Sequence, residues 1–101
     1  MKKESILLKK SDKAKRLKNV PLWTLCAKET AITRTFLFKS HVDALIFIAR
    51  ITVHAQVQNH HPEILFTYGK VKVTLSTHDV KGLTQKDFAL AEKIDALHSG
   101  G

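Results

Sequence analysis

The sequence predicts an α+β domain of two layers, in which a four-stranded antiparallel sheet is covered on one face by three helices. Three observations lead to this fold class: a long segment with helical periodicity, two β-rich segments around a glycine turn, and a second periodic segment near the C-terminus. Helices grouped on one face of an antiparallel sheet suit this order of elements. With 101 residues the chain is long enough for one hydrophobic core.

The first 18 residues are expected to form a basic arm or short helix, and residues 19–101 a single domain. The arm holds eight Lys or Arg against two acidic residues, a net charge of +6, whereas the rest of the chain carries +2. A helix over residues 11–18, capped by Ser11, would turn Ala14 and Leu17 inward. The segment is either a solvated end or an anion-binding arm. Nucleic-acid binding is not favoured, because no aromatic residue lies among the lysines.

Two strands are predicted before the long helix. Residues 23–27 predict a short strand, and residues 31–38 predict a longer one that is rich in β-branched and aromatic side chains. The two-residue period of a strand places Ile32, Phe36 and Phe38 on one face. We expect that face to point into the core.

The segment from Ser40 to Gln58 predicts the long helix, which begins with a capping box of Ser40 and Asp43 and ends before Pro62. An apolar stripe on such a helix faces the core. The stripe consists of Leu45, Ala49, Val53 and Val57, flanked by Val42, Ile46 and Ile48. The polar stripe consists of Asp43, Arg50, His54 and Gln58. Phe47 falls within the polar stripe, which indicates a subunit contact as well as a core contact.

Residues 64–68 and 71–77 predict an antiparallel hairpin with Gly69-Lys70 as its turn. A final helix follows, for which Thr84 and Asp87 form the structural cap. Its buried stripe consists of Phe88, Ala91, Ile94 and Leu97. The tail from His98 to Gly101 is expected to fray.

The composition excludes several classes of protein. Cys26 is the only cysteine, so an intramolecular disulfide framework is excluded and a reducing, cytoplasmic compartment fits best. The longest apolar stretch, residues 44–49, is too short to span a membrane. No secretory signal is recognisable, although the basic N-terminus leaves organelle targeting as an alternative.

Three histidines near the ends of two elements are the candidate catalytic residues. His60 follows the long helix, where unpaired carbonyls favour an imidazolium and suit it to donate a proton. His78 leaves the polar face of the hairpin strand and is suited to accept one. His61 must diverge from His60, because Pro62 takes it out of helical geometry. Adjacent histidines do not converge easily on one ion, so no metal is expected; histidines that merely end elements at a wet surface are the other alternative.

The residues from Asn59 to Glu63, with Tyr68, the run from Leu75 to Asp79, Gly82-Leu83 and Asp87, resemble the pterin-4a-carbinolamine dehydratases. The resemblance extends from Trp23 to Ile94. It implies loss of water from a 4a-hydroxytetrahydropterin after an aromatic amino-acid hydroxylase has acted, by proton transfers alone and without a cofactor. It also implies a homo-oligomer, either a dimer or a tetramer. Some members of this family are interaction proteins that bind a transcription factor, and this is the alternative function.

The resemblance assigns roles to individual residues. His60, His61 and His78 would be catalytic, and the pterin would be bound by Asn59, Ser76, Thr77 and Asp79. Around or behind the pocket we expect Gln56, Trp23, Tyr68 and Pro62, with core packing as the alternative for Trp23 and Tyr68. Gln56 departs from the family pattern, which usually has a charged residue there. Since Gln56 and His60 would lie one helical turn apart, we expect the amide to support the His60 imidazolium less well than a carboxylate would.

Overall fold

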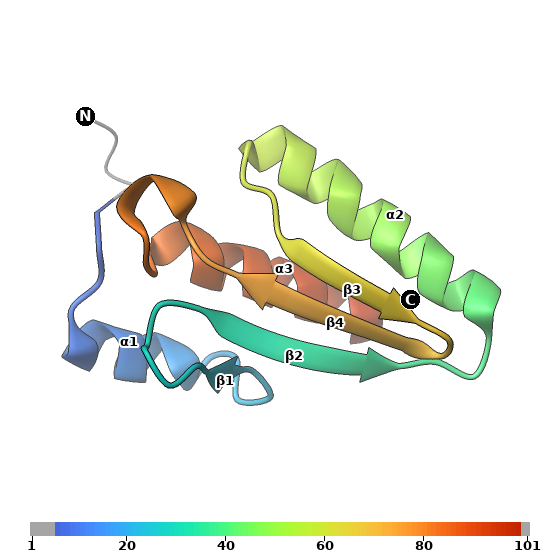
Figure 1. Ribbon diagram of the computed structural model, residues 1–101, viewed down its shortest axis with the longest axis horizontal. Helices are drawn as coiled ribbons and strands as arrows, with labels where there is room; N and C mark the ends of the chain where they lie inside the picture. The colour runs from blue at the N-terminus through green and yellow to red at the C-terminus, as the bar shows by residue number, and fades with distance from the viewer. Residues whose placement is uncertain (1–5, 100–101) are drawn as a thin grey trace.

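Four strands form one antiparallel sheet in the order β1-β2-β4-β3, and three α-helices complete an α+β fold (Figure 1). The structure is a computed structural model that describes residues 6–99. The elements are α1 (Lys10–Leu17), β1 (Thr24–Leu25), β2 (Ile32–Leu37), α2 (His41–Gln58), β3 (Glu63–Thr67), β4 (Lys70–Leu75), the 3₁₀ helix η2 (His78–Val80) and α3 (Gln85–Ser99). The predicted fold class is confirmed.

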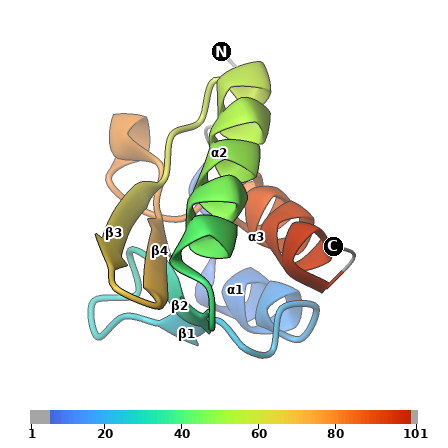
Figure 2. The same cartoon turned by 90° about the vertical axis from the view of Figure 1, so that its right-hand side faces the viewer.

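The three α-helices lie on the same side of the sheet (Figure 2). Strand side chains alternate accordingly, so that Ile32, Phe36 and Val73 are buried while Thr35 and Lys72 on the other face are exposed. In β4 the same alternation buries every second residue from Val71 onward. The core therefore lies between the inner face of the sheet and the helices.

Helix α2 buries a different face from the one that its apolar stripe predicted. Ser40 caps it as expected, since its side chain accepts the N–H of Asp43 at 3.3 Å. The buried residues, however, are Ala44, Phe47, Ile51 and Ala55. Phe47 packs on Phe36 at a ring-centroid distance of 4.8 Å, so the largest side chain of the helix fills the core. The predicted core contact of Phe47 is confirmed, and with 4% of this residue exposed it offers little surface for the predicted subunit contact. An apolar row along α2 stays exposed: Val42, Leu45, Ile46, Val53 and Val57.

Several element ends differ from the predictions. Helix α1 starts at Lys10 after Lys9, with no side-chain cap, so Ser11 lies inside the helix and does not cap it. The hairpin turns at Tyr68 and Gly69 instead of Gly69-Lys70. Gly69 has a φ of +74°, which a side chain would strain. Helix α3 continues to Ser99, so the expected fraying does not begin at His98; residues 100 and 101 lie outside the described part.

The described part of the basic N-terminal segment packs against the domain. The N–H of Leu8 bonds to the carbonyl of Leu83 at 2.9 Å, and Leu8 and Leu17 lie against the core. The ammonium of Lys13 donates to the carbonyl of Glu29 at 2.8 Å. Within residues 6–99, the helices are all too short or too polar to cross a lipid bilayer.

Candidate active site

The end of α2 decides where the two adjacent histidines point. Asn59 is left-handed, with a φ of 52°, and its N–H bonds to the carbonyl of Gln56 at 3.1 Å. The N–H of His60 reaches the carbonyl of Ala55 at 3.0 Å. These two bonds form a Schellman motif, which ends the helix before His60. The chain therefore turns away from the helix axis, so that His60 is buried and His61 is exposed.

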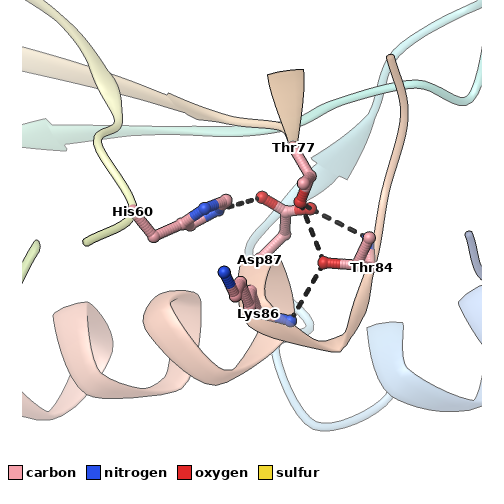
Figure 3. Close-up of polar contacts among 5 residues, drawn as sticks. All are labelled: His60, Thr77, Thr84, Lys86 and Asp87. Carbon is pink, nitrogen blue, oxygen red and sulfur yellow. Dashed lines mark hydrogen bonds and ion pairs between the residues drawn. The ribbon is translucent and has the colours of Figure 1, made fainter. Parts of the chain in front are cut away.

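His60 is held by Asp87, a carboxylate in the first turn of α3 (Figure 3). The Nε2 atom of His60, whose side chain is 7% exposed, lies 2.6 Å from Oδ1 of the fully buried Asp87. Oδ2 of Asp87 accepts the Thr77 hydroxyl at 2.8 Å and the Thr84 N–H at 2.9 Å. Burying a carboxylate costs free energy unless hydrogen-bond donors satisfy its oxygens. We call this hydrogen-bonded group the Asp87 network; it consists of His60, Thr77, Thr84 and Asp87.

The Asp87 network has one consistent direction of hydrogen-bond donation. Because Thr77 donates its hydroxyl proton to Asp87, the 2.8 Å bond between the two threonine hydroxyls takes its proton from Thr84. The Thr84 hydroxyl in turn accepts the backbone N–H of Lys86 at 3.2 Å. A carboxylate has no proton to give, so Nε2 of His60 is the donor toward Asp87. In the neutral ring this leaves Nδ1 of His60 as a proton acceptor.

A cavity of about 270 Å³ lies beside the Asp87 network. It forms where the end of α2, the loop after β4 and the first turn of α3 meet. Its lining residues are Asn59, His60, His61, Thr77, His78, Asp79 and Lys86. Ligand pockets typically enclose roughly 300 to 1,000 Å³, so this cavity suits a small molecule of which one part remains in solvent.

Gln56 contacts His61 and not His60, contrary to the expectation from helical spacing. That expectation assumed that the helix continues through His60, but α2 ends at Gln58. Oε1 of Gln56 lies 3.3 Å from Nε2 of His61, and both residues are exposed. The Gln56 amide therefore interacts with the His61 ring.

The cavity brings all three histidines together, although His78 reaches it differently from the prediction. Strand β4 ends at Leu75, and His78 begins η2, where it is exposed. Asn59 and Asp79, two of the expected pterin-binding residues, line the cavity with it.

Thr77 and Ser76, the other two expected pterin-binding residues, are placed differently. Thr77 lines the cavity, but its hydroxyl is bound to Asp87, so this group positions the carboxylate. Its burial could have been predicted from the sequence, because Thr77 lies two residues after the buried Leu75 and so continues the alternation of β4. Ser76 is half-buried and is not among the residues that line the cavity.

Three residues expected near the pocket lie outside its lining. Trp23 is 4% exposed and belongs to the core, where its indole N–H donates to Asp95 at 2.8 Å. Tyr68 is 81% exposed at the β3–β4 turn and stacks on His41 at a centroid distance of 5.0 Å. Pro62 is half-buried beside the cavity-lining His61. Core packing is thus the observed environment of Trp23, and Tyr68 lies at the opposite end of β4 from the cavity.

Comparison with known proteins decides the family. The model of the pterin 4 alpha carbinolamine dehydratase family matches residues 7–97. The chain belongs to this family. A Rhodospirillum rubrum protein is 47% identical over 83 residues, which are 82% of this chain and 86% of that protein. A Burkholderia ambifaria protein is 43% identical over 88 residues, 87% of this chain and 86% of that protein. Both carry the provisional name pterin-4-alpha-carbinolamine dehydratase.

Two solved structures share the fold of this dehydratase-family chain. A transcriptional coactivator/pterin dehydratase from Brucella melitensis has a TM-score of 0.87 and 35% identity, over 91% of this chain and 98% of that one. A pterin dehydratase-like protein, identified as a RuBisCO assembly factor in the alpha-carboxysome, has a TM-score of 0.64 and 24% identity. It covers 74% of this chain and 87% of its own, and at this identity it shows the fold alone.

Two features of this dehydratase-family site were missed from the sequence. Thr84 and Asp87 form the predicted capping box, but Asp87 also binds His60, which lies 27 residues earlier. The available signal was the place of Asp87 in the family pattern. Lys86 also lines the cavity, and it could have been found from the sequence because it lies between the predicted cap residues Thr84 and Asp87. The positively charged ammonium of Lys86, beside three histidines, can bind electron-rich groups of a ligand.

Other reactive side chains of this family member lie elsewhere. Cys26 is in the turn between β1 and β2, where a hydrogen bond with Thr30 lowers the pKa of the thiol to about 7. It is not among the residues that line the cavity. Across residues 6–99, we find no cluster of three or more His, Cys, Asp or Glu side chains with the spacing that a metal ion requires.

The Asp87 network makes Thr77→Val a test of its contribution to stability. Valine keeps the shape of the side chain but removes one donor from Asp87 and the acceptor of the Thr84 hydroxyl. We expect the free energy of unfolding to fall by about 1–3 kcal/mol, as for other buried polar groups left unpaired. Urea denaturation measures it. Thr35→Val, on the exposed face of β2, is the matched control and should change it by less than about 0.5 kcal/mol; equal effects would contradict the network.

The contact of Gln56 with His61 makes Gln56→Glu a test of which histidine this position influences. A carboxylate there favours the imidazolium of its neighbour, so the titration midpoint of His61 should move to higher pH. The midpoint of His60 should stay within error of the wild type. NMR signals of the imidazole carbons follow both rings separately. A shift of His60 without a shift of His61 would restore the helical-spacing interpretation.

Proposed function

We propose that this chain removes water from a 4a-hydroxytetrahydropterin and releases quinonoid dihydropterin, with histidines as acid and base and without a cofactor. Membership of the family supports the reaction. The observation that carries the proposal is the 2.6 Å contact between His60 and the buried Asp87 at the wall of the cavity. A ring held in one tautomer by a carboxylate is suited to proton transfer, because it is oriented before the substrate arrives.

The proposed reaction requires two proton transfers. One acid protonates the 4a-hydroxyl, so that the carbon–oxygen bond breaks with water as the leaving group. A base removes the proton of the adjacent ring nitrogen, whose electron pair forms the new carbon–nitrogen double bond. The products are quinonoid dihydropterin and water. The base has then gained one proton and the acid has lost one, so the count balances, and proton exchange through solvent returns both residues to their starting states.

The Asp87 network suggests how these roles are divided. Nδ1 of His60 is the acceptor in the neutral ring, and the imidazolium formed after proton transfer would face the Asp87 carboxylate. We therefore propose His60 as the base, the reverse of the role that its place after a helix suggested. His61 and His78 are exposed at the cavity, and either is suited to deliver the proton to the hydroxyl.

We also propose that this reaction follows an aromatic amino-acid hydroxylase, which would leave the pterin hydroxylated at carbon 4a, as the family resemblance implies. We propose a cytoplasmic enzyme for this step. Asn59, Asp79 and Lys86 would bind the polar edge of the pterin, since they line the cavity together with the histidines.

Dehydratase activity is measured by following the formation of quinonoid dihydropterin. We expect a wild-type rate well above the buffer reaction, and a loss of roughly 10²- to 10⁴-fold in His60→Ala and His78→Ala, the range of general acid–base catalysis. His61→Ala should also be slower. Asp87→Asn should lower the rate because the amide cannot hold the same tautomer of His60 as a carboxylate.

His54→Ala, on α2 and outside the cavity lining, is the control and should retain the wild-type rate. A wild-type rate equal to that in buffer would contradict the proposed activity. It would favour the alternative, in which the same fold serves as an interaction or transcription-cofactor module.

We also propose that the chain forms a homo-oligomer through α2. Val42, Leu45 and Val53 are 62%, 48% and 61% exposed, and with Ile46 and Val57 they make a continuous apolar row. An 18-residue helix with this row can pack against the same helix of a second copy, as a self-complementary contact requires. The row is also the observation that keeps the interaction-module alternative open.

Val53→Asp tests the α2 contact. A charge at the middle of the apolar row would be buried without a partner, so we expect self-association to weaken at least about tenfold. Light scattering coupled to size-exclusion chromatography measures the mass. Ala96→Asp, at an exposed position of α3, is the control and should keep the wild-type mass. An unchanged mass for Val53→Asp would contradict this surface.

A further inference from the structure

The loop that carries His78 is closed at its base by the backbone. The N–H of Thr77 bonds to the carbonyl of Gly82 at 2.7 Å, and the N–H of Gly82 returns a bond to Thr77 at 3.3 Å. Between them lie η2 and the left-handed Lys81, with a φ of 54°. We call residues 77–82 the His78 loop. Since His78 and Asp79 are exposed, the position of this loop decides where both side chains enter the cavity.

The N-terminal segment, residues 6–8, lies against the base of the His78 loop. Figure 1 shows this segment in blue beside the orange loop, and the Leu8 N–H bonds to the Leu83 carbonyl at 2.9 Å, one residue beyond the loop. A methyl group of Leu7 occupies the space next to Gly82. A Cβ atom placed on Gly82 would lie 2.6 Å from Cδ2 of Leu7, which is closer than atoms approach in folded proteins.

The close approach at Gly82 involves the Leu7 side chain and has no counterpart in the backbone angle. Gly82 does not adopt the positive φ that favours glycine; Gly69 does. The next nearest atom to the added Cβ would be the Val80 carbonyl oxygen at 3.9 Å, an ordinary contact. A methyl group on Gly82 would therefore conflict with the Leu7 side chain alone.

We propose that Leu7 and Gly82 are positioning residues, through which the N-terminal segment holds the His78 loop in place for catalysis. Leu7 closes over Gly82 while Leu8 fixes the backbone beside it, so the loop is held from outside as well as by its own bridge. The role in catalysis rests on the proposed dehydration. The contact itself can be tested without any assay of activity.

The test compares Leu7→Ala, Gly82→Ala and the double variant. Gly82→Ala pushes the Leu7 side chain aside and Leu7→Ala removes it, so each should release the same restraint. We expect either change to lower kcat/KM about tenfold, since small misplacements of catalytic groups have effects of this size or larger. The double variant should be no worse than Leu7→Ala, because nothing remains to be displaced. Ile6→Ala, a neighbour of similar exposure, is the matched control and should behave as wild type.

NMR signals of the His78 imidazole and of the amides of residues 77–83 give a second readout. They should shift in Leu7→Ala and Gly82→Ala, and the double variant should coincide with Leu7→Ala. If these signals shift and the wild type does not dehydrate pterins, the contact stands and the proposed function fails. If the wild type is active and the single variants match Ile6→Ala in both readouts, the proposal is overturned. Losses of kcat/KM that multiply in the double variant would also overturn it, because independent sites multiply.

Discussion

The buried carboxylate of Asp87 is the interaction on which the site depends. Its three donors come from three parts of the chain: His60 after α2, Thr77 after β4, and the backbone of Thr84 at the start of α3. Removing a carboxylate from water costs several kcal/mol unless its oxygens are satisfied. The buried carboxylate is therefore stable only when all three parts of the chain have reached their final positions. The same arrangement that stabilises the fold here also assembles the site.

This constraint also separates the three histidines. His60 is buried and oriented through Nε2, whereas His61 and His78 reach the cavity from the surface. Different environments for chemically identical side chains allow one site to contain both a proton acceptor and a proton donor at the same pH. The Schellman motif at Asn59 produces this difference, because after it His60 is buried and His61 stays at the surface.

Helix α2 illustrates how far periodicity can mislead. It is apolar around most of its circumference, so more than one face was compatible with a core. Phe47 packs against the ring of Phe36 in β2 at 4.8 Å and against that of Phe38, just after this strand, at 5.2 Å. The aliphatic row from Val42 to Val57 is left exposed as a consequence. Which face is buried depends on the shape of the surface opposite, and that information is absent from the helix itself.

The sequence by itself determined the features that depend on neighbours in the chain: the fold class, the caps at Ser40 and Thr84, the alternation in β4, the group of three histidines and the family pattern. The caps and the alternation are each encoded within one helical turn or one strand, where local geometry leaves little choice. The fold class, the group of histidines and the family pattern follow from the order of such segments along the chain.

The tertiary structure decided the partners. It placed His60 on Asp87, Gln56 on His61 and Leu7 on Gly82. One left-handed residue at Asn59 redirects the chain, so spacing counted along an unbroken helix predicts the wrong neighbour. Contacts between residues 27 or 75 positions apart form only where separate elements meet, and the sequence carries no local signal of that meeting point.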